Sequence, residues 1–276
     1  MSLPPGRPKE GGVPSGGTAR SAREPISPPP GRPKEGSLPL GWTARSAKDA
    51  PMCTPSEHEQ TLRGAVIATA LAMNARGINR GKSGNVSARL RGGDFDGFVV
   101  TPTGLAYDET RAEDIVPMTL DGESRGSRLP SSEWRFHRDI YRARPEVSAV
   151  VHTHAPFATT LACLHRGIPA FHYMVAVAGG RDIRCAPYAT FGTQELSDRV
   201  LVALDGRKAC LLAHHGMIAV GTSLPDALAL AVEVETLAEV YWRALQIGQP
   251  EVLADAEMDV MLEKFRTYGQ PRRTKD

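Results

Sequence analysis

The chain has little cysteine and no long apolar run, and each absence excludes a class of protein. The four cysteines are scattered along 276 residues and form no Cys-x-x-Cys pair. We therefore expect reduced thiols packed inside a cytoplasmic protein, not disulfides or a thiolate metal site. No stretch reaches the about 18 apolar residues of a membrane span, so no membrane association is expected. The N-terminus also lacks the apolar segment of a secretory signal.

Neither the net charge nor the glycine-rich motif indicates a nucleic-acid or nucleotide partner. A formal net charge of +2 does not indicate nucleic-acid binding, and a hydrophobic content of 41% is enough for a substantial core. Gly81-Lys82-Ser83 matches the end of the Walker phosphate loop, but no glycine stands five positions before Gly81. A nucleotide site of that type is therefore not predicted.

Residues 1–51 differ in composition from the rest of the chain. Pro-Pro-Gly-Arg-Pro-Lys-Glu-Gly occurs at 4–11 and again at 29–36, and the stretch holds 11 of the 22 prolines. Eight Lys/Arg against four Asp/Glu make it basic, and it has few large apolar residues. We expect a disordered, dispensable extension, with Met52 as an alternative start, and a folded domain over 52–276.

Periodicity and turn signals predict one α/β domain after the extension. A capping box at Ser56 and Glu59 is expected to start the first helix, and Ser132 to cap a later one. Glu233, Glu235 and Glu239 are expected on a solvated or subunit-facing side of the long helix. Helices are predicted near 57–76, 133–144, 156–165, 194–204, 224–247 and 254–266, and strands near 97–101, 147–152, 168–173, 183–186, 209–214 and 217–220. Helices that alternate with short strands, some joined by tight turns, indicate a largely antiparallel sheet covered by helices.

Three histidines and a glutamate indicate a metal site. His152 and His154 end an apolar run as His-x-His, so a strand would place both side chains on one face. His215 precedes a glycine after a second apolar run, and Glu133 lies in Pro-Ser-Ser-Glu-Trp. Three imidazoles and one carboxylate form a set that Zn²⁺ accepts in tetrahedral geometry. Histidines that are only core or surface residues are the alternative interpretation.

Three polar loops predict an anion site. Gly81–Ser87, Thr101–Gly104 and Ser131–Ser132 present backbone N–H groups and hydroxyls next to predicted helices and strands. Such loops bind phosphate at nests and helix N-termini, although glycine-rich turns without a ligand are also common.

Long motifs make residues 57–269 resemble the class II aldolase/adducin family. The matching stretches are Gly84-Asn-Val-Ser87, Thr101-Pro-Thr-Gly104, Leu129-Pro-Ser-Ser-Glu-Trp-Arg-Phe-His137, Val150-Val-His-Thr-His154, His172-Tyr-Met, Cys185-Ala-Pro-Tyr-Ala-Thr-Phe-Gly-Thr193, His214-His-Gly216 and Glu263-Lys-Phe-Arg-Thr-Tyr-Gly269. The resemblance implies a single domain with a largely antiparallel central sheet and helices on both faces.

The resemblance also implies roles for individual residues. One Zn²⁺ per subunit is expected on His152, His154, His215 and Glu133, and Glu133 is also expected to transfer a proton. Tyr173 is expected to act as an acid in a neighbouring subunit's site. The expected phosphate ligands are Asn85, Thr103, Gly104, Ser131 and Ser132. The expected residues at the aldehyde end are Phe191 and Tyr268. Lys82 departs from the family pattern and is expected either near the phosphate or in solvent.

The implied activity is reversible cleavage of a ketose 1-phosphate by a class II, metal-dependent lyase. The first expectation is L-fuculose 1-phosphate, which gives dihydroxyacetone phosphate and L-lactaldehyde in a cytoplasmic homotetramer with sites at subunit interfaces. A deoxy- or methylthio-pentulose 1-phosphate is the nearest alternative. A pentulose 5-phosphate 4-epimerase, a dehydratase and a non-catalytic adducin-like module are the others, and the last would be expected to lack metal ligands.

Overall fold

A computed structural model describes residues 56–92 and 95–267, which form helices around one sheet. The seven strands lie in the order β3-β2-β1-β4-β7-β6-β5. Neighbours are antiparallel except β5 and β6, which are parallel. The strands are β1 (Asn85–Gly92), β2 (Phe95–Val100), β3 (Val116–Thr119), β4 (Ala149–Thr153), β5 (Cys185–Ala186), β6 (Ala209–Leu212) and β7 (Gly216–Gly221). The predicted α/β class with a largely antiparallel sheet is confirmed.

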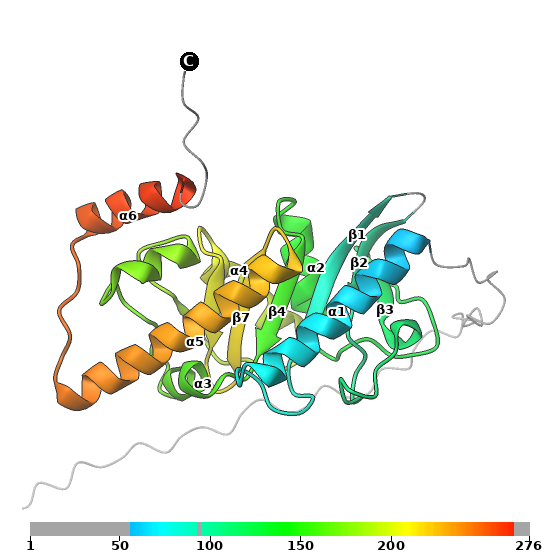
Figure 1. Ribbon diagram of the computed structural model, residues 1–276, viewed down its shortest axis with the longest axis horizontal. Helices are drawn as coiled ribbons and strands as arrows, with labels where there is room; N and C mark the ends of the chain where they lie inside the picture. The colour runs from blue at the N-terminus through cyan, green and yellow to red at the C-terminus, as the bar shows by residue number, and fades with distance from the viewer. Residues whose placement is uncertain (1–55, 93–94, 268–276) are drawn as a thin grey trace, which may run out of the picture. The chain divides into compact units, whose positions relative to one another are not determined.

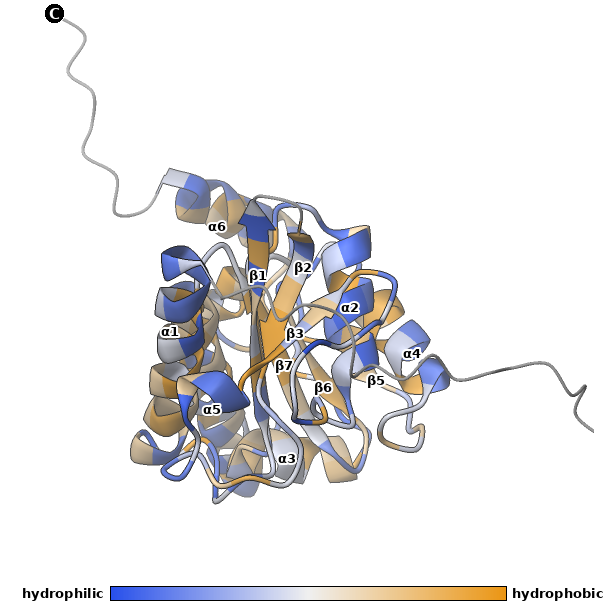
Figure 2. Ribbon diagram, turned by 90° about the vertical axis from the view of Figure 1, so that its right-hand side faces the viewer, coloured by the Kyte–Doolittle hydropathy of each residue, from blue (hydrophilic) through white to orange (hydrophobic). Residues whose placement is uncertain are grey.

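Helices cover both faces of the sheet, as Figures 1 and 2 show. The α1, α3 and α5 helices pack on one face, and α2 and α4 pack on the other. The α-helices are α1 (Glu57–Ala75), α2 (Trp134–Ala143), α3 (Pro156–Cys163), α4 (Gln194–Leu204), α5 (Leu224–Ile247) and α6 (Asp255–Thr267), and the 3₁₀ helices are η1 (Ala112–Asp114) and η2 (Tyr173–Ala178). The α6 helix lies beside η2. None of the helices described is both long and apolar enough to cross a bilayer.

Strand alternation separates two apolar cores. On β4, Ala149 and Val151 join the core under α1, α3 and α5, whereas Val150 joins the core under α2 and α4. Since side chains two apart share a face, His152 points to the same side as Val150. The metal-binding motif therefore faces α2, and α2 directly follows Glu133.

The helix ends follow ordinary capping chemistry. Ser56 Oγ accepts a hydrogen bond from the Glu59 amide at 3.1 Å and so caps α1, as predicted. Thr193 and Ser223 cap α4 and α5 in the same way, and both helices have the predicted bounds. The prediction that Ser132 caps α2 is wrong, because Glu133 occupies the N-cap position without a side-chain bond to the helix.

One predicted strand is wrong, and two strands were missed. Residues 168–173 form only one bridge, between Ile168 and Ile183, because Pro169 has no N–H to continue a ladder. The chain then turns into η2 at Tyr173. The sequence prediction also missed β1, which begins inside the glycine-rich loop, and β3, whose Pro117 is tolerated because β3 is an edge strand.

Some predictions fall outside the residues that the structure describes. These include the 1–51 extension, the boundary at Met52, and Tyr268. Within the described ranges, Cys163, Cys185 and Cys210 are free thiols. Cys210 is buried in the core as expected, whereas Cys163 is exposed.

Candidate metal and active site

Three histidines converge at one end of the central strands. His152 lies in β4, His154 follows that strand, and His215 occupies the turn between β6 and β7. The ring centroids of the three imidazoles are 4.8–5.0 Å apart, and Nε2 of His152 is 3.2 Å from Nε2 of His154. One potential ligand atom from each residue lies within 4.8 Å of those of the other two. The arrangement places three nitrogen donors around a single point.

The turn before β7 brings His215 close to the other two. His214 adopts a left-handed backbone conformation with φ of 56°, which reverses the chain within three residues. Gly216 then passes so close to β4 that an added Cβ would lie 2.5 Å from the Thr153 carbonyl oxygen and 3.0 Å from the His154 ring. The glycine after His215 is therefore required for the histidines to converge.

Glu133 supplies the fourth donor. Its Oε2 is 3.2 Å from Nε2 of His152, and its Oε1 is 3.3 Å from Nε2 of His215. The side chain is buried, and Oε1 has no hydrogen-bond partner. Ligands about 2.0–2.1 Å from a tetrahedral zinc lie about 3.3 Å from one another, so these spacings match the edges of a zinc tetrahedron. An unpartnered buried carboxylate oxygen facing imidazole lone pairs fits a bound cation.

The protonation states also suit a metal. Nδ1 of His152 donates to the Met217 carbonyl at 2.9 Å, which leaves the Nε2 lone pair directed toward the cluster. Burial, reinforced by the proximity of His152, lowers the pKa of His154 to about 4 and that of His215 to about 3. Burial by itself would raise the pKa of Glu133, but His152, His215 and the hydrogen bond from Asn85 together outweigh it and bring the pKa to about 2. Near neutral pH His154 and His215 thus offer neutral imidazoles, and Glu133 offers an anionic carboxylate.

The site opens into a pocket of about 330 Å³. Its lining residues come from the metal cluster and from the loops before β1, α2 and α4. They are Ser83, Ser132, Glu133, His154, Tyr188, Ala189, Phe191, His214 and His215. The structure thus brings Phe191 and Ser132 together with the cluster. Phe191 is 63% exposed and gives the pocket an apolar rim.

All three predicted phosphate loops are joined by hydrogen bonds beside this pocket, and the Ser131 amide donates to the Thr101 carbonyl at 3.0 Å. The Thr103 amide donates to the Leu129 carbonyl at 3.1 Å, in the segment that leads to Glu133. The Lys82 ammonium donates to the Gly104 carbonyl at 2.7 Å. Thr103 and Gly104 are exposed, so both remain accessible to a ligand. Lys82 therefore lies at the predicted phosphate loop.

Asn85, Ser131 and Ser132 have different environments. Ser132 is exposed and lines the pocket, whereas Ser131 is buried and its hydroxyl accepts from the Glu133 amide at 3.3 Å. Asn85 is also buried, and its Nδ2 donates to Oε2 of Glu133 at 2.9 Å. The Asn85 side chain is thus engaged with the carboxylate, and its role toward phosphate stays a prediction.

Tyr173 does not join the cluster within one chain. It begins η2, is 49% exposed, and is not among the residues described here that line the histidine pocket. Its participation requires a second copy of the chain, which stays a prediction.

Sequence reasoning missed several residues around the site. His214 and Tyr188 line the pocket, and Nε2 of His214 lies 2.7 Å from Nε2 of His165. Glu235 was expected on a solvated or subunit-facing side, but it is only 9% exposed. Its two oxygens accept from the Phe157 and Ala158 amides, both at 2.8 Å, and so cap α3. Glu235 lies 77 residues from Ala158 in the sequence, and no local pattern predicts this contact.

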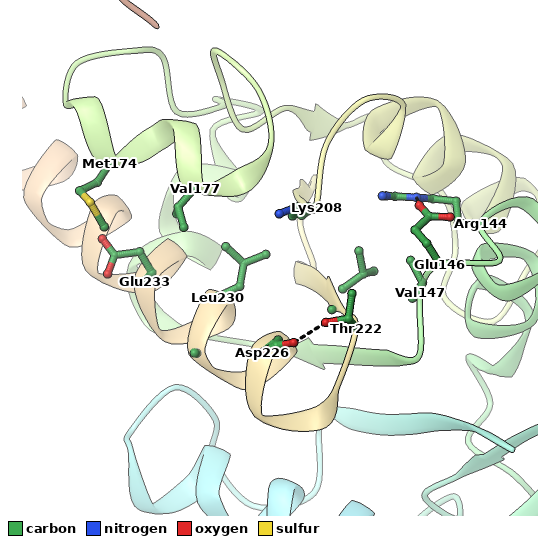
Figure 3. A pocket seen from close by; sticks show the side chains of 13 residues that line it. Arg144, Glu146, Val147, Met174, Val177, Lys208, Thr222, Asp226, Leu230 and Glu233 are labelled. Atoms are coloured by element: carbon green, nitrogen blue, oxygen red, sulfur yellow. Dashed lines mark hydrogen bonds and ion pairs between the residues drawn. The ribbon is translucent and has the colours of Figure 1, made fainter. Parts of the chain in front are cut away.

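A second and larger cavity, of about 410 Å³, lies between η2, α5 and the start of β4 (Figure 3). Arg144, Lys208, Glu146, Asp226 and Glu233 contribute charges to its lining. None of the three clustered histidines lines it. Its residues do not form a donor set like that around Glu133.

Comparison with known proteins agrees with this geometry. Residues 64–242 match the model of the Class II Aldolase and Adducin N-terminal domain. A 5-methylthioribulose-1-phosphate/5-deoxyribulose-1-phosphate aldolase of Rhodospirillum rubrum is 60% identical over 208 residues, which are 75% of this chain and 92% of the relative. An L-fuculose phosphate aldolase of Escherichia coli K12 is 51% identical over 205 residues, which are 74% of this chain and 94% of the relative.

A solved structure shares the fold as well. An L-fuculose 1-phosphate aldolase superposes with a TM-score of 0.70 at 40% identity and covers 75% of this chain and 96% of its own. The matched model covers more than half of the chain, and both relatives match over most of their length. The chain therefore belongs to the class II aldolase and adducin family, and it is a metal-dependent lyase of the aldolase type.

Proposed function

We propose that this chain is a zinc-dependent aldolase that cleaves a ketose 1-phosphate reversibly to dihydroxyacetone phosphate and an aldehyde. The observation that carries the proposal is the convergence of three histidines with a buried carboxylate at spacings close to those of a zinc tetrahedron. The donor set of three imidazoles and one exchangeable carboxylate is typical of a catalytic zinc rather than of a closed structural site.

The names of the relatives support a substrate with an apolar end. L-fuculose 1-phosphate, 5-deoxyribulose 1-phosphate and 5-methylthioribulose 1-phosphate share a ketone, a phosphate on carbon 1 and a terminal methyl or methylthio group. The names support both the first expectation, L-fuculose 1-phosphate, and its nearest alternative, a deoxy- or methylthio-pentulose 1-phosphate. We rank the 5-deoxy and 5-methylthio pentuloses first, because the relative named for them is 60% identical and the one named for L-fuculose is 51% identical.

The side chains for the metal are His152, His154, His215 and, before substrate binds, Glu133. When bound there, Zn²⁺ supplies Lewis-acid polarisation of the substrate carbonyl. Neutral imidazoles leave the charge of the ion undiminished, so it would polarise the carbonyl more strongly than it would with thiolate ligands. The buried Glu133 is positioned to exchange its place near the histidines for a role in proton transfer.

In the direction that forms the carbon–carbon bond, Glu133 takes a proton from carbon 3 of dihydroxyacetone phosphate. The electron pair left at carbon 3 forms the bond to the aldehyde carbon, and the aldehyde oxygen takes a proton from Tyr173 of a neighbouring subunit. Cleavage follows the same steps in reverse. One proton is removed and one is delivered, so the reaction needs no oxidant or reductant.

The remaining residues bind the two ends of the substrate. The phosphate is bound by the exposed Thr103, Gly104 and Ser132 and by the Lys82 ammonium. The buried Asn85 and Ser131 contribute to the same site. The Gly104 carbonyl holds the Lys82 ammonium at this loop, where its charge would stabilise a bound phosphate. Phe191 and Tyr268 contact the aldehyde end. We propose an oligomer with sites at subunit interfaces, because Tyr173 is exposed and lies outside the pocket of its own chain. The family resemblance makes a homotetramer the proposed state.

The test is release of dihydroxyacetone phosphate from purified, zinc-loaded protein. The panel consists of the three substrates above and ribulose 1-phosphate, which ends in a hydroxyl group. We expect release that stops on chelation and returns with zinc, and a kcat/KM for ribulose 1-phosphate at least about tenfold below the best substrate. No release from fully zinc-loaded protein would reject the aldolase proposal in favour of epimerisation or dehydration on the same scaffold.

A further inference from the structure

A chain of buried hydrogen bonds runs from Tyr141 to Glu133. The Tyr141 hydroxyl lies 2.8 Å from Ser87 Oγ, which lies 2.7 Å from Nδ1 of His137. Nε2 of His137 lies 2.5 Å from Oδ1 of Asn85, and Nδ2 of Asn85 lies 2.9 Å from Oε2 of Glu133. No member is more than 5% exposed, so the whole chain lies inside the protein.

The direction of the first bonds follows from the carboxylate. The Asn85 atom that faces Glu133 is the amide nitrogen, which donates to Oε2. The amide oxygen then faces His137, and this oxygen also only accepts. Nε2 of His137 must therefore carry a proton and donate it.

The direction of the remaining bonds follows from a neutral His137. Complete burial lowers the pKa of His137 to about 3, so the ring carries one proton near neutral pH. With that proton on Nε2, Nδ1 is an acceptor, and the Ser87 hydroxyl must donate to it. The Ser87 oxygen then accepts from the Tyr141 hydroxyl, whose pKa burial raises, so it keeps its proton. Every bond in the chain donates toward Glu133.

The residues come from facing elements at a fixed register. Asn85 and Ser87 lie two apart on β1 and share its face toward α2, and His137 and Tyr141 lie four apart on α2. Asn85 also pairs with His152 across β1 and β4, so the chain reaches the carboxylate beside the metal cluster. Sheet and helix together fix the geometry before any ligand binds.

We propose that His137 and Ser87 are positioning residues that hold Oε2 of Glu133 through Asn85 and leave Oε1 for the metal and the substrate proton. The two carboxylate oxygens thereby differ: Oε2 has the Asn85 amide as a partner, whereas Oε1 has no hydrogen-bond partner. Anchored by Oε2, the carboxylate rotates about one fixed point when substrate displaces it. This inference rests on the proton-transfer role proposed for Glu133.

A purely structural network makes a different prediction. Removal of a buried donor would then lower stability but leave kcat unchanged in the protein that folds. The two interpretations are separated by His137→Met, which has no donor, and His137→Gln, whose amide nitrogen can replace the imidazole Nε2–H. Leu204→Ala is the matched control, since Leu204 is buried in the same core but lies on α4, which contributes no residue to the hydrogen-bond chain.

The expected results concern kcat and zinc affinity. We expect His137→Met to lower kcat and zinc affinity by about tenfold to a hundredfold, the usual effect of losing a partner behind a metal ligand. His137→Gln should recover most of both, and Ser87→Ala should fall between the two. Leu204→Ala should lower the melting temperature without changing either quantity. Equal kcat and zinc affinity in folded His137→Met and wild type would overturn the proposal.

A second readout does not depend on activity. Nitrogen-15 NMR of the imidazoles should show His137 as the neutral Nε2–H tautomer in the wild type and in Ser87→Ala. An Nδ1–H tautomer or a charged ring at neutral pH would overturn the direction of the chain. If the wild type cleaves no ketose 1-phosphate, the proposed function fails, whereas the tautomer and the zinc affinities still decide the positioning role.

Discussion

The two cavities described above differ in how deeply their charged residues are buried, and the larger one has the more exposed charges. The larger cavity, of about 410 Å³, carries charges on accessible side chains, for example Glu146, which is 60% exposed and paired with Arg144. The histidine pocket is smaller, at about 330 Å³, yet it contains the buried Glu133 and borders the fully buried His152. Exposed charges are stabilised by water, whereas a buried carboxylate with an unpartnered oxygen requires a cation or a donor. Burial of titratable groups, rather than volume, therefore identifies the reactive site.

The largest effect expected from this comparison is that of His154→Ala. Loss of one imidazole from a three-histidine cluster should abolish stoichiometric zinc and reduce cleavage to background, because one side of the ion would lose its ligand and Glu133 would have to stay on the metal instead of transferring a proton. Metal analysis of the dialysed protein checks this directly. Glu146→Gln, in the larger cavity, is the control and should keep full zinc and wild-type turnover. Full zinc in His154→Ala would remove it from the ligand set.

Glu133→Gln should separate metal binding from proton transfer. The amide keeps the shape of the side chain but cannot carry a proton, so we expect kcat to fall by about 10²–10⁴-fold. Zinc should be kept or modestly weakened, since the three histidines remain. Single-turnover release of dihydroxyacetone phosphate measures the chemical step. Turnover equal to that of wild type would exclude Glu133 as the proton carrier.

Acid should destabilise the metal-free protein through the buried histidines. The pKa values of His154 and His215, at about 4 and about 3, lie below the ordinary value of 6.5. The unfolded chain then binds protons that the folded chain excludes, so stability is present above pH 6.5 and is lost as the pH falls toward 4. Each histidine contributes up to about 1.4 kcal/mol per pH unit in this window.

Urea unfolding of the apo protein between pH 7 and pH 5 measures this loss. Metal-free His154→Ala should show a shallower pH dependence of stability, because it lacks one of the histidines that bind a proton only in the unfolded chain. An unfolding midpoint that does not move between these pH values would contradict the prediction.

The smallest expected effect is a difference in the free energy of unfolding between variants of two glutamates on α5. Glu235→Ala leaves the Phe157 and Ala158 amides without their acceptor, so we expect a loss of about 1–3 kcal/mol in the free energy of unfolding. Because α3 starts two residues after His154, zinc affinity should also fall. Glu233→Ala, on the side of the larger cavity, should change stability by less than about 0.5 kcal/mol. Equal effects in chemical denaturation would show that the α3 cap is not what Glu235 contributes.

Elements with strong local signals were predictable from the sequence. The α4 and α5 helices have the predicted bounds because a capping hydroxyl, Thr193 or Ser223, precedes each and their apolar residues recur at helical spacing. The predicted strand at 168–173 failed because its only partner pairing, to Ile183, stops at Pro169. The β1 strand was missed because its first residues also belong to a glycine-rich loop.

The residues at and near the site fall into the same two groups, those with a local sequence signal and those without one. His152, His154, His215 and Glu133 were predicted from short motifs, and the structure brings all four together. The burial of Glu235 was not predictable, because the amides that it caps lie on a different helix.

By itself, the sequence determined the family, the donor types and the shared strand face of His152 and His154, since these depend on residue identity and on the two-residue period of a strand. Only the tertiary structure decided that His215 meets them, that one oxygen of Glu133 has no hydrogen-bond partner, and that Ser87, His137 and Asn85 form a single buried chain. These are contacts between residues 48 to 65 positions apart, such as Asn85 with Glu133 and His152 with Met217. Their geometry depends on how the sheet and α2 pack, and no local pattern in the chain encodes that packing.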